Sequence, residues 1–178
     1  YYPDAGARQA RGDPGSTFRL LNGVALYGGF TGVETRRAQR DWAANLTVLS
    51  GDIDSNDLSE SSGIVPAAVR LRGKNAYNVV TAQGVSASAV LDGFVVTAGQ
   101  ATGSRDPESH GGGITIRDRS SVTLANITLV GNTAAAGTSN GLYWSEDSSP
   151  YLTNVTLGKP QAALIETGAG SGPLADTN

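Results

Sequence analysis

One segment of the chain, residues 120–134, recurs at residues 148–162, and this repeat constrains the fold more than any other feature. The two segments align without a gap, and seven of the fifteen positions are identical. A weaker copy lies upstream, where Leu91, Phe94, Val96 and Ala101 fall over Leu124, Ile127, Leu129 and Ala134. Repetition at a fixed period indicates that similar structural units are stacked on one another.

The apolar residues of each copy follow the pattern Leu-x-x-Φ-x-Φ, where Φ is apolar and the last two are spaced as on a β-strand. Other strand-like runs are 23–30, 45–49 and 77–81. The period of the repeat, 28, is too long for a hairpin and too short for an ordinary βαβ unit. A leucine-rich repeat would be shorter and more regular. One coil of a parallel β-helix fits, because each coil buries its apolar residues against the next. The sequence therefore predicts an all-β, parallel β-helix fold.

The composition limits the classes of function. Glycine is frequent, with 24 of 178 residues, and aromatic residues make up 6%, which suits short strands and tight turns. The lack of cysteine rules out disulfides and cysteine metal sites. A net charge of -3 gives no reason to expect a nucleic-acid partner. No apolar run is long enough to predict a membrane span.

Residues 34–42 depart from the strand pattern and are expected to form a short N-terminal helix. Thr31 or Thr35 is a suitable residue to cap it. Trp42 is then expected to pack onto the first coil. This helix is the one non-β element that the sequence predicts.

The chain is expected to form one β-helix domain over residues 1–167, followed by a flexible tail at 168–178. The tail prediction follows from the run GAGSGP, which has the composition of a linker. An uncapped stack exposes unpaired strand edges, which would allow an end-to-end homodimer. The start at Tyr1, without methionine, is typical of a mature or excised fragment.

Five stretches resemble a known family. They are 23–31 (GVALYGGFT), 39–45 (QRDWAAN), 49–54 (LSGDID), 90–96 (VLDGFVV) and 111–114 (GGGI). These are similar to right-handed β-helix repeat, pectin-lyase-like proteins found in secreted or surface proteins of bacteria. The resemblance implies a right-handed β-helix, export from a bacterial cell and contact with carbohydrate. It does not specify an activity, because such folds carry lyases, hydrolases and adhesins.

An acidic loop at 51–57 is a candidate calcium site, because Ca²⁺ is bound by several oxygen ligands from a flexible turn. The oxygen-bearing side chains are Asp52, Asp54, Asn56 and Asp57. The match to an EF-hand loop is partial, since Asp57 stands where glycine is required and Gly63 stands where glutamate is required. The alternative is a turn in which these side chains accept hydrogen bonds from their own backbone.

The offset of the strong repeat also places Asp118 beside Glu146 and Arg119 beside Asp147. Arg119 and Asp147 are then expected to form an ion pair across neighbouring strands. Two carboxyl groups about 5 Å apart suit a retaining glycosidase, so Asp118 and Glu146 are the candidate catalytic pair. The alternative is two solvated acids on the surface.

Three further features are candidates for binding or structure. His110 is the single histidine and is a candidate acid, base or metal ligand, with an exposed loop histidine as the alternative. Trp144 and Tyr151 are candidates for stacking on a sugar, or for packing beneath a loop. Asn126 and Asn154 are expected to form a ladder of side-chain amides.

Two functions remain open from the sequence. The first is an exported or cell-surface module that contacts a polysaccharide or cell-surface glycan, or mediates adhesion, without catalysis of its own. The second is a carbohydrate-active enzyme that cleaves a linear polysaccharide. It would be either a hydrolase using Asp118 and Glu146, or a lyase that depends on calcium at Asp52 and Asp54.

Overall fold

A computed structural model describes residues 1–7, 9–105, 107–135, 140–145 and 147–158, and the backbone of residues 166–167 and 175–176. Every strand pair in these residues is parallel. The only helical elements in the described part are two single 3₁₀ turns, η1 (Arg37–Gln39) and η2 (Ala68–Arg70). The prediction of an all-β chain with parallel pairing is therefore confirmed.

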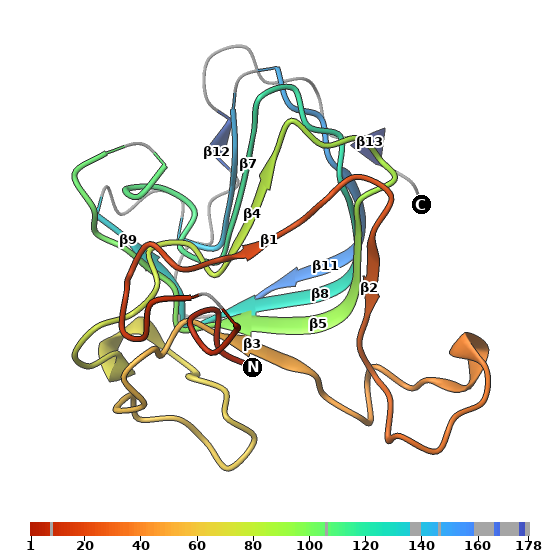
Figure 1. The fold of residues 1–178 in the computed structure, drawn as a ribbon, viewed down its shortest axis with the longest axis horizontal. Helices are drawn as coiled ribbons and strands as arrows, with labels where there is room; N and C mark the ends of the chain where they lie inside the picture. The colour runs from red at the N-terminus through yellow and green to blue at the C-terminus, as the bar shows by residue number, and fades with distance from the viewer. Residues whose placement is uncertain are drawn as a thin grey trace.

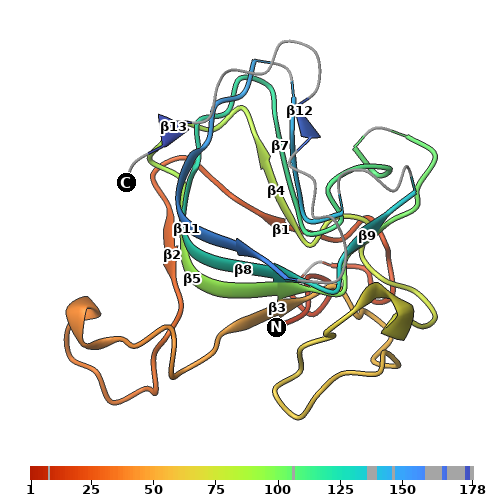
Figure 2. The ribbon, with the colours of Figure 1, turned by 180° about the vertical axis from the view of Figure 1, so that it is seen from behind.

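The strands form two main sheets and one small sheet (Figures 1 and 2). The first sheet contains β1 (Phe18–Arg19), β4 (Val80–Gln83), β7 (Ile114–Arg117), β10 (Leu142–Trp144) and β12 (Glu166–Thr167). The second contains β2 (Ala25–Tyr27), β3 (Val48–Ser50), β5 (Val90–Thr97), β8 (Thr123–Val130), β11 (Tyr151–Leu157) and β13 (Ala175–Asp176). The third pairs β6 (Gln100–Ala101) with β9 (Thr133–Ala134). The chain visits the first and second sheets in turn, and we call each round a pass.

The strand register confirms both copies of the sequence repeat. β7 and β10 pair Ile114 with Leu142, at the offset of the strong repeat. In the second sheet, Leu124 pairs with Leu152 on one side, at the same offset, and with Leu91 on the other, at the offset of the weaker copy. The pattern Leu-x-x-Φ-x-Φ therefore places equivalent apolar side chains next to one another in successive passes.

These apolar columns form the main core between the two large sheets. Its most deeply buried large side chains are Trp144, Leu91, Ile114, Ile116, Leu124, Ile127, Leu129 and Leu142. The long strands of the second sheet change direction at one residue with positive φ, which is Gly93 (86°), Asn126 (51°) or Asn154 (51°). Because the strand turns at this corner, residues on both sides of it face the same core. The leucine and the first Φ of the pattern are therefore separated by two residues, whereas the two Φ positions are separated by one.

The predicted helix at 34–42 is reduced to η1. The expected threonine caps are not formed, because Thr31 bonds to the Glu34 side chain and the backbone N–H of Thr35 donates to the Gln39 side chain. These side-chain acceptors satisfy the backbone locally and compete with helical hydrogen bonds. Trp42 does lie against β5 at Gly93, although the tryptophan remains 38% exposed.

At the other end, the backbone of residues 175–176 pairs with β11, within the segment predicted as a tail. The rest of 168–178 lies outside the described residues. Nowhere in the described part of the chain does a helix reach the length and apolarity that a membrane crossing requires.

Candidate functional site

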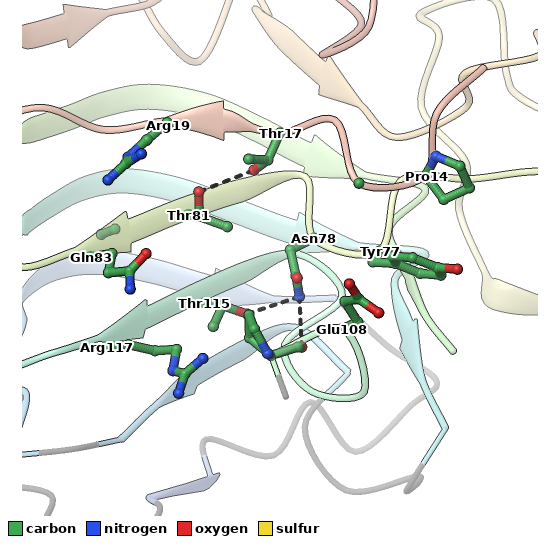
Figure 3. A pocket seen from close by; sticks show the side chains of 13 residues that line it. Pro14, Thr17, Arg19, Tyr77, Asn78, Thr81, Gln83, Glu108, Thr115 and Arg117 are labelled. Atoms are coloured by element: carbon green, nitrogen blue, oxygen red, sulfur yellow. Dashed lines mark hydrogen bonds between the residues drawn. The ribbon is translucent and has the colours of Figure 1, made fainter. Parts of the chain in front are cut away.

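A polar groove of about 320 Å³ lies on the outer face of the first sheet (Figure 3). Side chains alternate between the two faces of a strand, so every second residue of β1, β4 and β7 faces outward. The groove is lined by Pro14, Gly15, Thr17, Arg19, Tyr77, Asn78, Thr81, Ala82, Gln83, Pro107, Glu108, Thr115 and Arg117. It therefore combines hydroxyl, amide, guanidinium and carboxylate groups on strands that lie about 4.8 Å apart.

One wall of the groove is the loop before β7, and Asn78 anchors it. The buried Asn78 side chain donates from Nδ2 to the carbonyls of His110 (2.6 Å) and Gly111 (3.0 Å) and to Oγ1 of Thr115 (3.0 Å). Across the floor, Oγ1 of Thr17 donates to Oγ1 of Thr81 at 3.3 Å. These bonds fix the shape of the groove, which reduces the entropy lost when a ligand binds.

The charged and amide groups of the groove are distributed unevenly. Arg19, Gln83 and Arg117 lie toward one end, and Glu108 lies toward the other beside Tyr77 (Figure 3). Arg19 is exposed and forms no ion pair with any residue that the structure describes. This end of the groove offers hydrogen-bond donors to hydroxyl or acidic groups of a ligand.

The predicted catalytic pair is only half described. Asp118 follows β7 with a φ of 55°, is exposed, and accepts a hydrogen bond from Nε2 of Gln83 at 2.6 Å. Glu146 lies outside the described residues, so the pair stays a prediction. The predicted Arg119–Asp147 ion pair is not formed. Among the described residues, the one ion pair joins Arg40 and Asp92. Arg119 and Asp147 are both exposed, where charges gain little from pairing.

The predicted sugar platform of Trp144 and Tyr151 is not present. Trp144 is 1% exposed and packs in the core, so its ring has no face for a ligand. Tyr151 is 43% exposed but belongs to the other sheet. Alternation along β10 turns Tyr143 outward instead, and the ring of His110 covers it at a centroid distance of 4.8 Å.

His110 has a packing role in addition to its loop position. Besides the contact with Tyr143, its Nδ1 lies 2.9 Å from the hydroxyl oxygen of Ser109. Its carbonyl is held by Asn78 and Thr115. The histidine therefore helps to fix the wall of the groove, and any role as an acid, base or ligand stays a prediction.

The acidic loop at 51–57 is tied to the chain's own donors. Asp52 is 7% exposed and accepts the backbone N–H groups of Asn56 (3.0 Å) and Asp57 (3.3 Å). Asp54 accepts the N–H of Lys74 at 2.8 Å. Asp57 accepts the N–H of Arg72 at 2.5 Å and Nδ2 of Asn75 at 2.6 Å. These contacts match the turn alternative, in which the side chains cap backbone groups.

The calcium site at Asp52, Asp54, Asn56 and Asp57 stays a prediction. In the described residues, no group of three or more His, Cys, Asp or Glu side chains converges as metal ligands would. At least one oxygen of each of the three carboxylates accepts an N–H hydrogen bond. A cation at the loop would have to displace some of these bonds.

Partial burial raises the pKa of Asp52 and of Asp57 above the ordinary value of 3.8, although backbone N–H donors act in the opposite direction. A carboxyl with a raised pKa binds its proton more tightly in the folded state. The contribution of these two carboxyl groups to the stability of the fold is therefore greatest below pH 3.8. It is lost as the pH rises through their folded pKa values.

Replacing Asp57 with asparagine is expected to weaken this fall, because the amide carries no charge and still accepts the Arg72 N–H. In urea unfolding between about pH 3 and pH 7, the variant should gain stability relative to the wild type as the pH rises. Asp147→Asn, an exposed change on another pass, serves as the control. A stability difference that stays constant over this range would contradict the assignment of burial as the cause.

A column of polar side chains crosses the corners of the second sheet, and it confirms the predicted amide ladder. Nδ2 of Asn154 donates to Oδ1 of Asn126 at 2.8 Å. Nδ2 of Asn126 donates to Oδ1 of Asp92 at 2.8 Å. Asp92 in turn pairs with Arg40 at 2.5 Å. The sequence repeat predicted the two asparagines but not the ionic end of the column.

Comparison with protein-family models, with curated proteins and with solved structures finds no match. The resemblance to pectin-lyase-like proteins therefore stays a prediction. The groove was not predicted from the sequence. Its signal is the alternation of outward polar residues in β4 and β7, where Thr81 and Gln83 lie beside Thr115 and Arg117.

Proposed function

We propose that the chain is a right-handed parallel β-helix module of a secreted or cell-surface bacterial protein. Parallel pairing throughout the described strands and the alternation between two sheets support a coiled path. Crossover connections between parallel strands are right-handed in nearly all proteins. In this reading each pass is one coil, and the corner residues Gly93, Asn126 and Asn154 mark equivalent positions.

The proposed activity is contact with a polysaccharide or cell-surface glycan, without catalysis by this chain. The observation that carries it is the groove on the first sheet, where hydroxyl, amide and guanidinium groups stand in rows on rigid strands. Sites built on strands hold their side chains in register, and polar side chains at fixed spacing can bind the hydroxyl groups of a sugar chain. An adhesive role and an end-to-end homodimer also stay proposals.

Arg19→Ala combined with Gln83→Ala is expected to weaken glycan binding by about tenfold or more, because two hydrogen-bonding groups leave the groove. Neither side chain supports the core, since both are exposed. The measurement is affinity electrophoresis or a glycan array over neutral and acidic polysaccharides. Arg70→Ala, an exposed change in η2, is the control.

An unchanged affinity in the double variant would contradict the proposal that the groove binds the glycan. The same panel should be assayed for release of reducing ends and of unsaturated products. Turnover would favour the second function, an enzyme. Asp118 is then the residue to test, because its hydrogen bond with Gln83 places it at the edge of the groove. That activity should then be lost in Asp118→Asn and in Glu146→Gln.

A further inference from the structure

The first pass carries an arm at the corner where later passes have a single residue with positive φ. β2 pairs with the first half of β5 and β3 pairs with the second half, so residues 28–47 are inserted between them. The arm, drawn in orange, projects from the body on the side away from the loop before β7 that forms a wall of the groove (Figures 1 and 2). Its base is closed by the Asp41 N–H, which donates to the Gly29 carbonyl at 2.8 Å.

The backbone of the arm is held by its own side chains. The Glu34 carboxylate accepts the N–H of Thr31 (2.9 Å), and this bond is the main reason that the pKa of Glu34 falls to about 2. Oε1 of Gln39 accepts the N–H groups of Thr35 and Arg36, both at 2.9 Å. The arm therefore has a defined shape, and these backbone donors are already used.

An open pocket of about 400 Å³ lies on the arm. Its lining consists of Tyr27, Phe30, Glu34, Thr35, Arg36 and Arg37. The Arg37 guanidinium lies 4.7 Å above the centre of the Tyr27 ring and donates to the Tyr27 hydroxyl at 2.7 Å, so its position is fixed. Phe30 is 41% exposed.

The pocket keeps an excess of positive charge, because its two arginines outnumber the one carboxylate of the lining, Glu34, and neither arginine forms an ion pair with a described residue. Arg40, the third arginine of the arm, is engaged by Asp92. Arg36 and Arg37 are exposed and have no ion-pair partner among the described residues. The protein as a whole has a charge of -3, so this is a local basic site on an acidic molecule.

We propose that this pocket binds the anionic group, a carboxylate or a sulfate ester, of an acidic glycan. Arg36 and Arg37 hold the anion, since guanidinium groups match the geometry of such oxyanions. Phe30 packs against the apolar face of the sugar ring that carries it. An acidic peptide fits less well, because the backbone donors of Thr31, Thr35 and Arg36 are already engaged within the arm.

The test is equilibrium binding of the full chain to polygalacturonate, dextran sulfate, neutral dextran and polyglutamate. The wild type is expected to bind at least one of the two acidic glycans, and their comparison shows whether carboxylate or sulfate is preferred. Arg36→Ala should weaken that binding about tenfold, and the Arg36→Ala, Arg37→Ala double variant should weaken it further. Phe30→Ala should weaken it by about threefold to tenfold.

The matched control is Arg11→Ala with Arg70→Ala, which removes the same charge from exposed sites outside the arm. An equal loss in both double variants, or equal binding of neutral dextran, would overturn the proposal. Tighter binding of polyglutamate than of either acidic glycan would also overturn it. Repeating the series with Arg19 and Gln83 replaced by alanine separates the arm from the groove, because the arm effect should persist there.

Discussion

Leu124→Ala is expected to lower the free energy of unfolding by about 2–5 kcal/mol, which is the usual cost of emptying a leucine site in a packed core. Leu124 is fully buried and stands between Leu91 and Leu152 in the central apolar column. A cavity there removes contacts from both neighbouring passes at once. Urea unfolding followed by circular dichroism should show a lower midpoint with an unchanged slope.

Two leucines serve as comparisons for this change. Leu152→Ala lies in the same column but is only partly buried, so its cost should be smaller. Leu21→Ala removes a side chain that is 54% exposed and should change stability by about 0.5 kcal/mol or less. If Leu124→Ala cost no more than Leu21→Ala, the register between the passes would be wrong.

Asn126→Ala is expected to lower the free energy of unfolding by about 2–4 kcal/mol. The change removes the hydrogen bonds to Asp92 and from Asn154, each contributing about 1 kcal/mol. It also forces alanine to adopt a φ of 51°, which costs about 1–2 kcal/mol more than for a residue that tolerates this region. Thermal or urea unfolding measures the sum.

Asn126→Gly separates the two contributions, because glycine adopts positive φ freely but makes no ladder bonds. Its cost should therefore be smaller than that of alanine. Asn154→Ala loses one ladder bond at an exposed position and provides a second comparison. Equal losses for alanine and glycine at position 126 would show that the corner conformation contributes nothing.

The repeat predicted the pairing between passes because it records spatial neighbours directly. Residues that occupy equivalent places in successive passes pair with one another and face the same core, and Leu91, Leu124 and Leu152 are accordingly all leucine. The first pass was harder to predict. Its strands β2 and β3 are short and are separated by the arm, so the period is lost there.

The site was predicted less well, because function here depends on which face a residue occupies and on what covers it. The adjacency of Tyr143 and Trp144 did not reveal that Trp144 points into the core and that His110 covers Tyr143. The acidic loop was correctly identified as a cluster of acceptors, but the donors of Asp54 and Asp57 come from residues 72–75, which no local pattern connects to it. The groove draws on β1, β4 and β7, whose polar residues are dispersed along the chain.

The constant offset between the pass of β7 and β8 and the pass of β10 and β11 has a consequence for how such a chain can lengthen. β7 pairs with β10 and β8 pairs with β11 at one and the same spacing along the sequence. A tandem duplication of residues 120–147 would therefore insert one complete layer in frame, with both sheets still in register. The new layer would bring its own corner asparagine, so the column from Asp92 to Asn154 would gain a rung. Growth by whole layers extends the outer surface while the existing layers keep their neighbours.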